Sequence, residues 1–344
     1  MKTFIGWGYC LLKTDWYGIW RLANDAQENS GFTRFGLIAD LMVSTLYYEV
    51  SPSEYFYFRF PSMGKNERVR WAGTTAMWKA QRSFIPKEII STFSSKEIFR
   101  ARFDHLMAEH AGMISWPHIQ NSLVKRLLDQ GVSSWFFKPE DGQCGAGGFS
   151  LEVGGFNAEV LHDELGKRLR NGRKYIVERK LVNHDELRIV NPSCLNTVRV
   201  VTYTDGEDVE LLFSRIRFGN GGDVDNLGAG GFAAEVDSVT GKVTGAAVCT
   251  RSGLAEYYQT HPISKIKFEG IEIPHWEKVI ELVKSAAMVE TKASIVGWDV
   301  AVTDSGVYLL EGNHNWCKLL WQLPVREGLK AELEKYMQMV DHVR

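Results

Sequence analysis

Several protein classes are excluded by what the sequence lacks. It has only five cysteines in 344 residues, scattered and never in C-x-x-C spacing, which argues against a disulfide framework and a zinc site. It has no long Lys/Arg tract, and its net charge of −2 gives no field that would attract nucleic acid. No apolar run approaches the roughly 18 residues of a membrane span. We therefore expect a cytoplasmic protein with no nucleic-acid partner and no membrane span.

The sequence does contain long stretches with regular apolar patterns. Residues 1–93 are rich in aromatics, and we expect a mostly helical region whose aromatic side chains pack in a core. From Ser94 a capped helix begins, which Gly112 is expected to end. The remaining chain reads as helices and alternating strands with little βαβ order. The pattern predicts an α+β fold in which residues 1–93 form a separate N-terminal region.

An acidic hairpin near the C-terminus carries the strongest chemical signal. With a three-residue turn at 304–306, Thr303 is expected to pair with Val307, which places Asp299 directly opposite Glu311. Facing carboxylates repel each other, and a divalent cation between them would remove the repulsion. A solvated acidic face is the alternative. The nearby tryptophans and glycine favour an enclosed site.

Alternation along this hairpin predicts which residues share a face. Asn313 follows Glu311 by two positions and joins the acids. Residues expected beside the acids are Ala301, Thr303 and Leu309, and those expected on the apolar face are Val300, Val302, Tyr308 and Leu310.

A second hairpin, over residues 196–218, carries arginines. With its turn near Gly206, Arg199 is expected opposite Phe213 and Thr197 opposite Arg215. Arg199, Arg215 and Arg217 would then project from one face. Three crowded guanidinium groups suit a phosphate or carboxylate, although a surface row of arginines would look the same.

Two further segments carry weaker signals. Lys138 ends an apolar strand and precedes the glycine-rich loop PEDGQCGAGG, whose backbone amides could close on phosphate. A plain flexible hairpin is the alternative. Cys144 in this loop is either a reduced thiol or a nucleophile that lacks an evident base. Glu178 ends the apolar strand of YIVERKL.

Taken in order, these segments resemble the ATP-grasp family, and most closely its branch found beside sugar-transfer genes. The likeness covers roughly residues 94–325. The corresponding positions are Lys96 in SSKEIF, Lys138 with the lid FFKPEDGQCGAGG, Glu178 in YIVERKL, Arg199 in NTVRVVT, Arg215, Arg217, Asp225 and Asn226 in the RxRxG and VDN segments, and Asp299, Glu311 and Asn313 in GWDVAV and LEGN. The lid departs from its relatives by having Cys144 and Ala146 where many carry serines.

The resemblance implies two α+β subdomains that clasp ATP, a small lid subdomain at 94–182 and a large one at 183–344. Metal ligands would be Asp299, Glu311 and Asn313, holding Mg²⁺, with Mn²⁺ as an alternative. ATP would contact Lys96, Lys138, Gly145, Gly147, Gly148, Glu178, Arg217, Asp225 and Asn226. Catalytic roles would fall to Arg199, Arg215 and Lys138. His314 would be a base or a hydrogen-bonding partner.

Three functions are consistent with this resemblance. Most relatives ligate a carboxylate to an amine or another nucleophile through an acylphosphate and release ADP, and the substrates here would be small-molecule or saccharide-linked. A small-molecule kinase would use the same Mg·ATP site. A non-catalytic nucleotide-binding or scaffold protein is disfavoured by the intact set of metal ligands.

Overall fold

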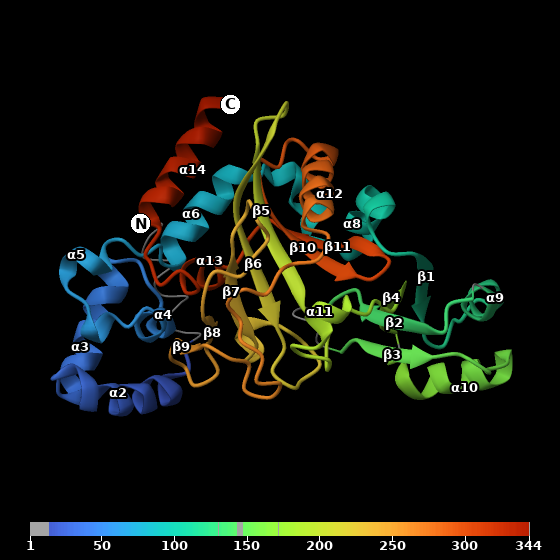
Figure 1. The fold of residues 1–344 in the computed structure, drawn as a ribbon, viewed down its shortest axis with the longest axis horizontal. Helices are drawn as coiled ribbons and strands as arrows, with labels where there is room; N and C mark the ends of the chain where they lie inside the picture. The colour runs from blue at the N-terminus through green and yellow to red at the C-terminus, as the bar shows by residue number, and fades with distance from the viewer. Residues whose placement is uncertain (1–13, 130, 143–146, 171, 344) are drawn as a thin grey trace.

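Two antiparallel β-sheets organise the fold (Figure 1). The computed structural model describes residues 14–129, 131–142, 147–170 and 172–343. The small sheet and its helices lie at one end of the molecule, the large sheet occupies the middle, and the first helices of the N-terminal region lie at the other end. This mixed architecture confirms the α+β class. The division at 93 and 182 stays a prediction.

The N-terminal region is largely helical, as expected. Its helices are α2 (Trp16–Ser30), α3 (Arg34–Tyr47), α4 (Pro52–Tyr57), α5 (Lys65–Arg68), α6 (Thr74–Phe84) and α7 (Ile90–Ser94), with 3₁₀ turns at Phe60–Ser62 and Lys87–Ile89. Tyr55, Phe56, Phe58 and Phe60 are fully buried in a cluster that also contains Trp71. These aromatics therefore pack in a core, and the cluster extends to Leu227 and Leu320 of the C-terminal half.

Helix α8 (Lys96–Phe103) begins where expected, and the Oγ of Ser95 accepts a hydrogen bond from the backbone N–H of Ile98. The predicted end at Gly112 is wrong. The helix stops at Phe103, a 3₁₀ turn follows at Asp104–Leu106, and Gly112 lies inside strand β1 (His110–Ser115). Pairing of β1 with β4 overrides the local helical spacing.

The small sheet has the strand order β1-β4-β2-β3. Its other strands are β2 (Ser134–Pro139), β3 (Phe149–Glu152) and β4 (Lys174–Arg179), and its helices are α9 (Asn121–Asp129) and α10 (Ala158–Arg168). Trp135 and Phe137 of β2 are buried with Leu161 and Leu165 of α10, because alternate residues of the strand face the helices.

The large sheet has the strand order β11-β10-β5-β6-β7-β8-β9. Its strands are β5 (Thr197–Thr204), β6 (Val209–Phe218), β7 (Phe232–Val236), β8 (Ala247–Cys249), β9 (Glu256–Tyr258), β10 (Ile295–Thr303) and β11 (Gly306–Asn313). The helices of this half are α11 (Asp185–Arg188), α12 (Trp276–Val289), α13 (Lys318–Gln322) and α14 (Lys330–Val343), with a 3₁₀ turn at Leu227–Ala229.

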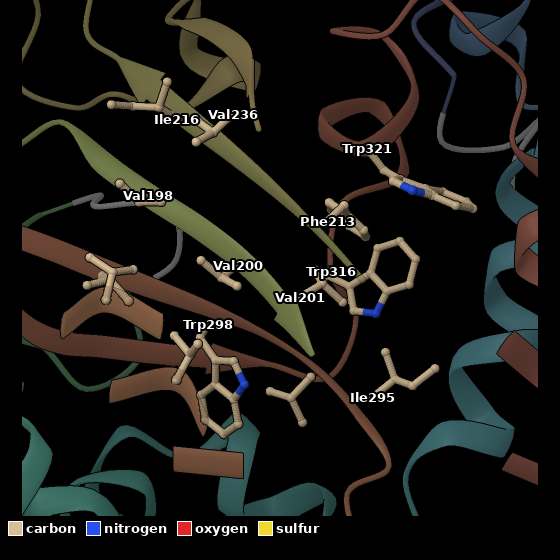
Figure 2. Close-up of a cluster of buried hydrophobic side chains, with 14 of the residues drawn as sticks. Val198, Val200, Val201, Phe213, Ile216, Val236, Ile295, Trp298, Trp316 and Trp321 are labelled. Atoms are coloured by element: carbon tan, nitrogen blue, oxygen red, sulfur yellow. The ribbon is translucent and has the colours of Figure 1, made fainter. Parts of the chain in front are cut away.

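Apolar side chains of the large sheet form the main core. Val198 and Val200 of β5, Ile216 of β6 and Trp298 of β10 are buried together with the inner face of α12. Figure 2 shows this cluster, in which Phe213 lies beside Trp316 and Trp321. The core fixes the strands that carry the predicted charged residues.

No helix in the described ranges combines the length and apolar character needed to cross a bilayer.

Candidate functional site

A narrow cleft separates the small sheet from strand β11 at the edge of the large sheet. It encloses about 30 Å³, far less than the roughly 300–1,000 Å³ of a typical ligand pocket. The residues that line it are Phe93, Ser95, Lys96, Phe99, Met107, Lys138, Ile176, Glu178, Leu310, Glu311 and Gly312. Four predicted site residues, Lys96, Lys138, Glu178 and Glu311, therefore meet in one place although they come from four different elements.

Lys96 joins helix α8 to the start of the glycine-rich loop. Its Nζ donates hydrogen bonds to the carbonyl oxygens of Pro139 (2.6 Å), Glu140 (3.3 Å) and Gly142. Burial, together with the ammonium of Lys138, lowers the pKa of Lys96. A positive charge held beside a second lysine is favoured by an anion placed between them.

Glu178 on β4 is held by an arginine that the sequence reasoning did not select. The Nη1 of Arg100 lies 3.2 Å from the Oε1 of Glu178, and its Nε lies 2.8 Å from the Oδ1 of Asp104. Arg100 is buried and also donates to the carbonyl of Ala108. The only sequence signal for it was its spacing: Arg100 follows Lys96 by one helical turn and so shares its side of α8.

The acidic hairpin has the predicted pair but a different turn. Asp299 lies opposite Glu311, as expected. Thr303 pairs with Gly306 rather than Val307, so the turn is one residue shorter, and a bulge between Asp299 and Val300 restores the register.

Because of the same bulge, two residues of β11 lie on the opposite face from the one predicted. Leu309 lies opposite Val300 and is buried with the apolar face, whereas Tyr308 lies opposite Ala301. The alternation breaks because the bulge adds a residue to one strand only.

Asp299 is buried and bonded to two arginines. Its Oδ2 accepts hydrogen bonds from the Nη2 of Arg199 (2.8 Å) and the Nη2 of Arg217 (2.9 Å), and its Oδ1 accepts from the Nε of Arg199. Burial alone would raise the pKa of Asp299, but the two guanidinium groups more than offset it, so its pKa lies well below the usual range. The carboxylate is therefore no part of a solvated surface.

Glu311 differs from Asp299 because it is only half-buried and faces the cleft. Its Oε1 accepts a hydrogen bond from the Nδ2 of Asn313 at 3.3 Å. Asn313 lies opposite Gly297 on the strand that carries Asp299. The three predicted metal ligands thus lie on adjacent positions of two paired strands. Among the described residues no group of three or more His, Cys, Asp or Glu side chains gathers as a metal site.

The arginines of the second hairpin share one face as predicted, but the pairing of the two strands differs from the prediction. Arg199 lies opposite Arg215, and Thr197 opposite Arg217. The predicted partners, Phe213 and Arg215, are each wrong by two positions: the turn shifts the register by one residue, and a bulge between Val201 and Thr202 shifts it by one more. A shift of two residues keeps every side chain on its face, so the three arginines do share one side.

Arg217 connects Asp299 to Asp225. Its Nε lies 3.6 Å from the Oδ2 of Asp225 and 3.0 Å from the Oγ1 of Thr197. The same carboxylate oxygen accepts the backbone N–H of Thr197 at 2.8 Å. Burial raises the pKa of Asp225, which Arg217 partly offsets. The side chain of Asn226 makes a local contact instead: its Oδ1 accepts a hydrogen bond from the backbone N–H of Gly228.

Arg215 forms its hydrogen bonds outside this cluster. Its Nη2 donates to the carbonyl oxygen of Trp321 (2.9 Å) and its Nη1 to that of Ser214 (2.8 Å), and its nearest carboxylate is Glu235, at 3.8 Å. Burial lowers the pKa of Arg215 to about 10. Its interactions fasten α13 to the sheet.

The lid and His314 complete the predicted set. Gly145 and Cys144 lie outside the described residues. Gly147 has φ +79°, and a Cβ there would meet the guanidinium of Arg173, while one at Gly148 would meet the ring of Phe136. Burial lowers the pKa of His314, whose Nδ1 has no hydrogen-bond partner.

Residues 161–338 match the family described as sugar-transfer associated ATP-grasp, and this match spans more than half of the chain. The chain belongs to the sugar-transfer associated ATP-grasp family. Every member of the buried arginine–aspartate cluster and of the acidic hairpin lies within the matched range, whereas Lys96 and Lys138 precede it. No curated protein matches the sequence.

Solved structures of ATP-grasp enzymes show a distant likeness. D-cycloserine synthetase DcsG is 11% identical over 86% of this chain and 82% of its own, with a TM-score of 0.44. D-alanine–D-alanine ligase from Bacillus anthracis is 10% identical over 80% and 79%, with a TM-score of 0.43. The ATP-grasp ligase PsnB with its minimal precursor is 12% identical over 75% and 63%, with a TM-score of 0.41.

Proposed function

We propose that this family member is an ADP-forming ligase that joins a carboxylate to an amine through an acylphosphate. One observation carries the proposal: two lysines and two carboxylates from separate elements line a single cleft between the two sheets. That set combines cations for phosphate oxygens with acids for a metal and for the nucleotide base. The reaction would take place in the cytoplasm, with ATP as a substrate.

The cleft residues would divide the nucleotide between them. Lys96 and Lys138 would neutralise phosphate oxygens, since each is a mobile point charge on a fixed element. Glu178, held by Arg100, would lie on the adenine side with the neighbouring backbone of β4. Gly147 and Gly148 would form the lid with Gly145. Because the cleft is narrow, the small sheet must move away from β11 to admit ATP and return to exclude water.

The oxygen donors of the acidic hairpin fit Mg²⁺ or Mn²⁺. Glu311 and Asn313 already lie within hydrogen-bond distance, and Glu311 faces the cleft. Asp299 would complete the set after giving up one of its arginine contacts. When bound, the metal would supply charge neutralisation at the β- and γ-phosphate oxygens.

The arginines would bind the negatively charged groups that the metal does not contact. Arg217 has a second carboxylate partner in Asp225, so it loses least when it releases Asp299. Arg199 would then face the substrate carboxylate and stabilise the oxyanion formed when the amine attacks the acylphosphate. The contacts of Arg215 favour a structural role over the catalytic one predicted for it. Asp225 and Asn226 would shape the neighbouring loop.

The acid and the amine are proposed as small-molecule or saccharide-linked compounds, in keeping with the family. An isotope experiment tests the reaction class. Carboxylic acids labelled with ¹⁸O, including uronic acids, are incubated with ATP, Mg²⁺ and amino acids or amino sugars. An acylphosphate route transfers one ¹⁸O atom to free phosphate, and only when both substrates are present.

Other outcomes of that experiment contradict the ligase. ADP with a stable phosphorylated product and no free phosphate would indicate the kinase. ATP binding without ADP formation across the panel would indicate a nucleotide-binding protein. Glu311→Ala serves as the control for phosphate released by contaminating enzymes.

A further inference from the structure

Helix α3 exposes an entirely apolar face. All its exposed residues are apolar: Phe35, Ala39, Val43, Leu46 and Tyr47. Phe35 is 77% exposed and Tyr47 is 73% exposed. Phe35, Ala39 and Val43 are spaced four residues apart, and Leu46 and Tyr47 follow Val43 by three and four, so all five lie along one side of the helix. A helix that is apolar on its outer side as well as its inner side is normally covered on both.

Helix α2 extends this face. The rings of Trp20 and Phe35 are in edge contact, with centroids 6.0 Å apart. Tyr17, one turn before Trp20, is 82% exposed. Tyr17, Trp20, Phe35, Ala39, Val43, Leu46 and Tyr47 are called here the α2–α3 patch. Exposed large apolar residues elsewhere, such as Val239 and Ile263, are scattered over separate elements.

The size of the α2–α3 patch is that of a protein interface. An aromatic side chain offers roughly 150–250 Å². The exposed fractions of its four aromatic residues (82%, 39%, 77% and 73%) therefore amount to roughly 400–700 Å² of ring surface. The aliphatic residues between them bring the patch close to the roughly 800 Å² that each partner contributes to a standard interface.

The charges of helix α3 favour a second copy of the chain over a membrane as its partner. A helix that lies on an anionic membrane needs a polar face rich in Lys and Arg. Helix α3 has one basic residue, Arg34, whose guanidinium lies over the ring of Trp20. Its one acid, Asp40, is bonded to Arg68 and Tyr55. Helix α3 has no charge on its exposed side. Two copies of α3 could therefore pack on each other across a two-fold axis without like charges facing each other.

We propose that the protein forms a symmetric dimer through the α2–α3 patch, with α3 packed on α3 of a second copy. The patch lies at the opposite end of the molecule from the small sheet (Figure 1). Both clefts stay outside the interface, and each small sheet remains free to move. Dimerisation and ATP turnover are therefore separable.

Sedimentation equilibrium of the full chain across a wide concentration range tests the proposal. The wild type is expected to reach the dimer mass. Val43→Glu and Val43→Lys should each raise the dimer dissociation constant at least a hundredfold, because like charges then meet in an apolar interface. An equimolar mixture of the two variants should recover the dimer. Tyr47→Ser tests the same surface without adding charge.

The controls separate this interface from general surface effects. Val239→Glu changes a valine that is 86% exposed outside the patch, and it should leave the dimer intact. The Val43 variants should keep the wild-type melting temperature and the wild-type ATP turnover. A wild type that stays monomeric, whether free, covered by its own residues 1–13 or bound to anionic vesicles, overturns the proposal. So does a dimer that survives Val43→Glu.

Discussion

Two neighbouring strands of the large sheet place their carboxylates in different environments. Glu311 on β11 is half-buried and faces the cleft, and its Oε1 accepts a hydrogen bond from the amide of Asn313. Asp299, directly opposite on β10, is sealed from solvent and bonded to two guanidinium groups. The carboxylate of the edge strand therefore faces the cleft, whereas the carboxylate of the next strand is paired within the sheet.

A row of charges across five strands explains the difference. Glu311, Asp299, Arg199, Arg215 and Glu235 lie opposite one another in succession on β11, β10, β5, β6 and β7. The row has acids at both ends and arginines in the middle. Asp299 is the acid next to the arginines, so it is neutralised within the protein. Glu311 lies one strand farther out, where a cation from solution can take that place.

Asp299→Asn is the substitution expected to have the largest effect. It leaves Arg199 buried opposite a neutral amide, and removing one partner of a buried pair typically costs about 3–5 kcal/mol of unfolding free energy. ATP turnover should be lost as well. Denaturant unfolding measures the first effect, and ADP formation measures the second. Unchanged stability would show that Asp299 is not the anchor of the arginines.

Glu311→Ala sharpens the comparison from the other side. We expect at least a hundredfold loss of ATP turnover, which corresponds to about 2.7 kcal/mol of barrier. Its unfolding free energy should change little, because Glu311 is half-exposed. Glu311→Gln is the matched control of similar size, and it should show the same loss if the charge matters. Turnover and Mg·ATP binding equal to the wild type would contradict the proposed metal site.

Much of this geometry follows from alternation in the sequence. The α+β class, the shared face of the three arginines and the opposition of Asp299 and Glu311 were all predicted. The exact partners were not, because neither the length of each turn nor the extra strand residue of each bulge, in ELLFS and in YLLEG, has a clear signature in the sequence. In the acidic hairpin a short turn and a bulge cancelled each other, so the predicted pair was right for an incomplete reason.

Contacts between distant segments could not be predicted. Separate roles were predicted for Arg199, as part of an anion site, and for Asp299, as a metal ligand, yet the structure joins them in one buried ion pair. Arg100 holds Glu178 across 78 positions of the chain. Such pairs depend on the order of strands in a sheet and on how a helix packs against a sheet, and the apolar pattern of each segment specifies neither.

The pH dependence of stability is the smallest expected effect. The folded state lowers the pKa of Asp299 below its unfolded value of about 3.9. Asp299 therefore contributes stability above that value, and the contribution is lost as pH falls below it. Asp225 acts with the opposite sign, because its pKa is raised, so its contribution is lost as pH rises.

Unfolding free energies of the wild type and Asp299→Asn, measured from neutral pH down to pH values near 3, separate these two acids. The difference between the two proteins should be constant near neutrality and should shrink by on the order of 1–3 kcal/mol below about pH 4, as for a single ion-paired carboxylate. Asp225→Asn should change the pH dependence of the unfolding free energy with the opposite sign. A difference that does not change with pH would mean that the charge of Asp299 does not stabilise the fold.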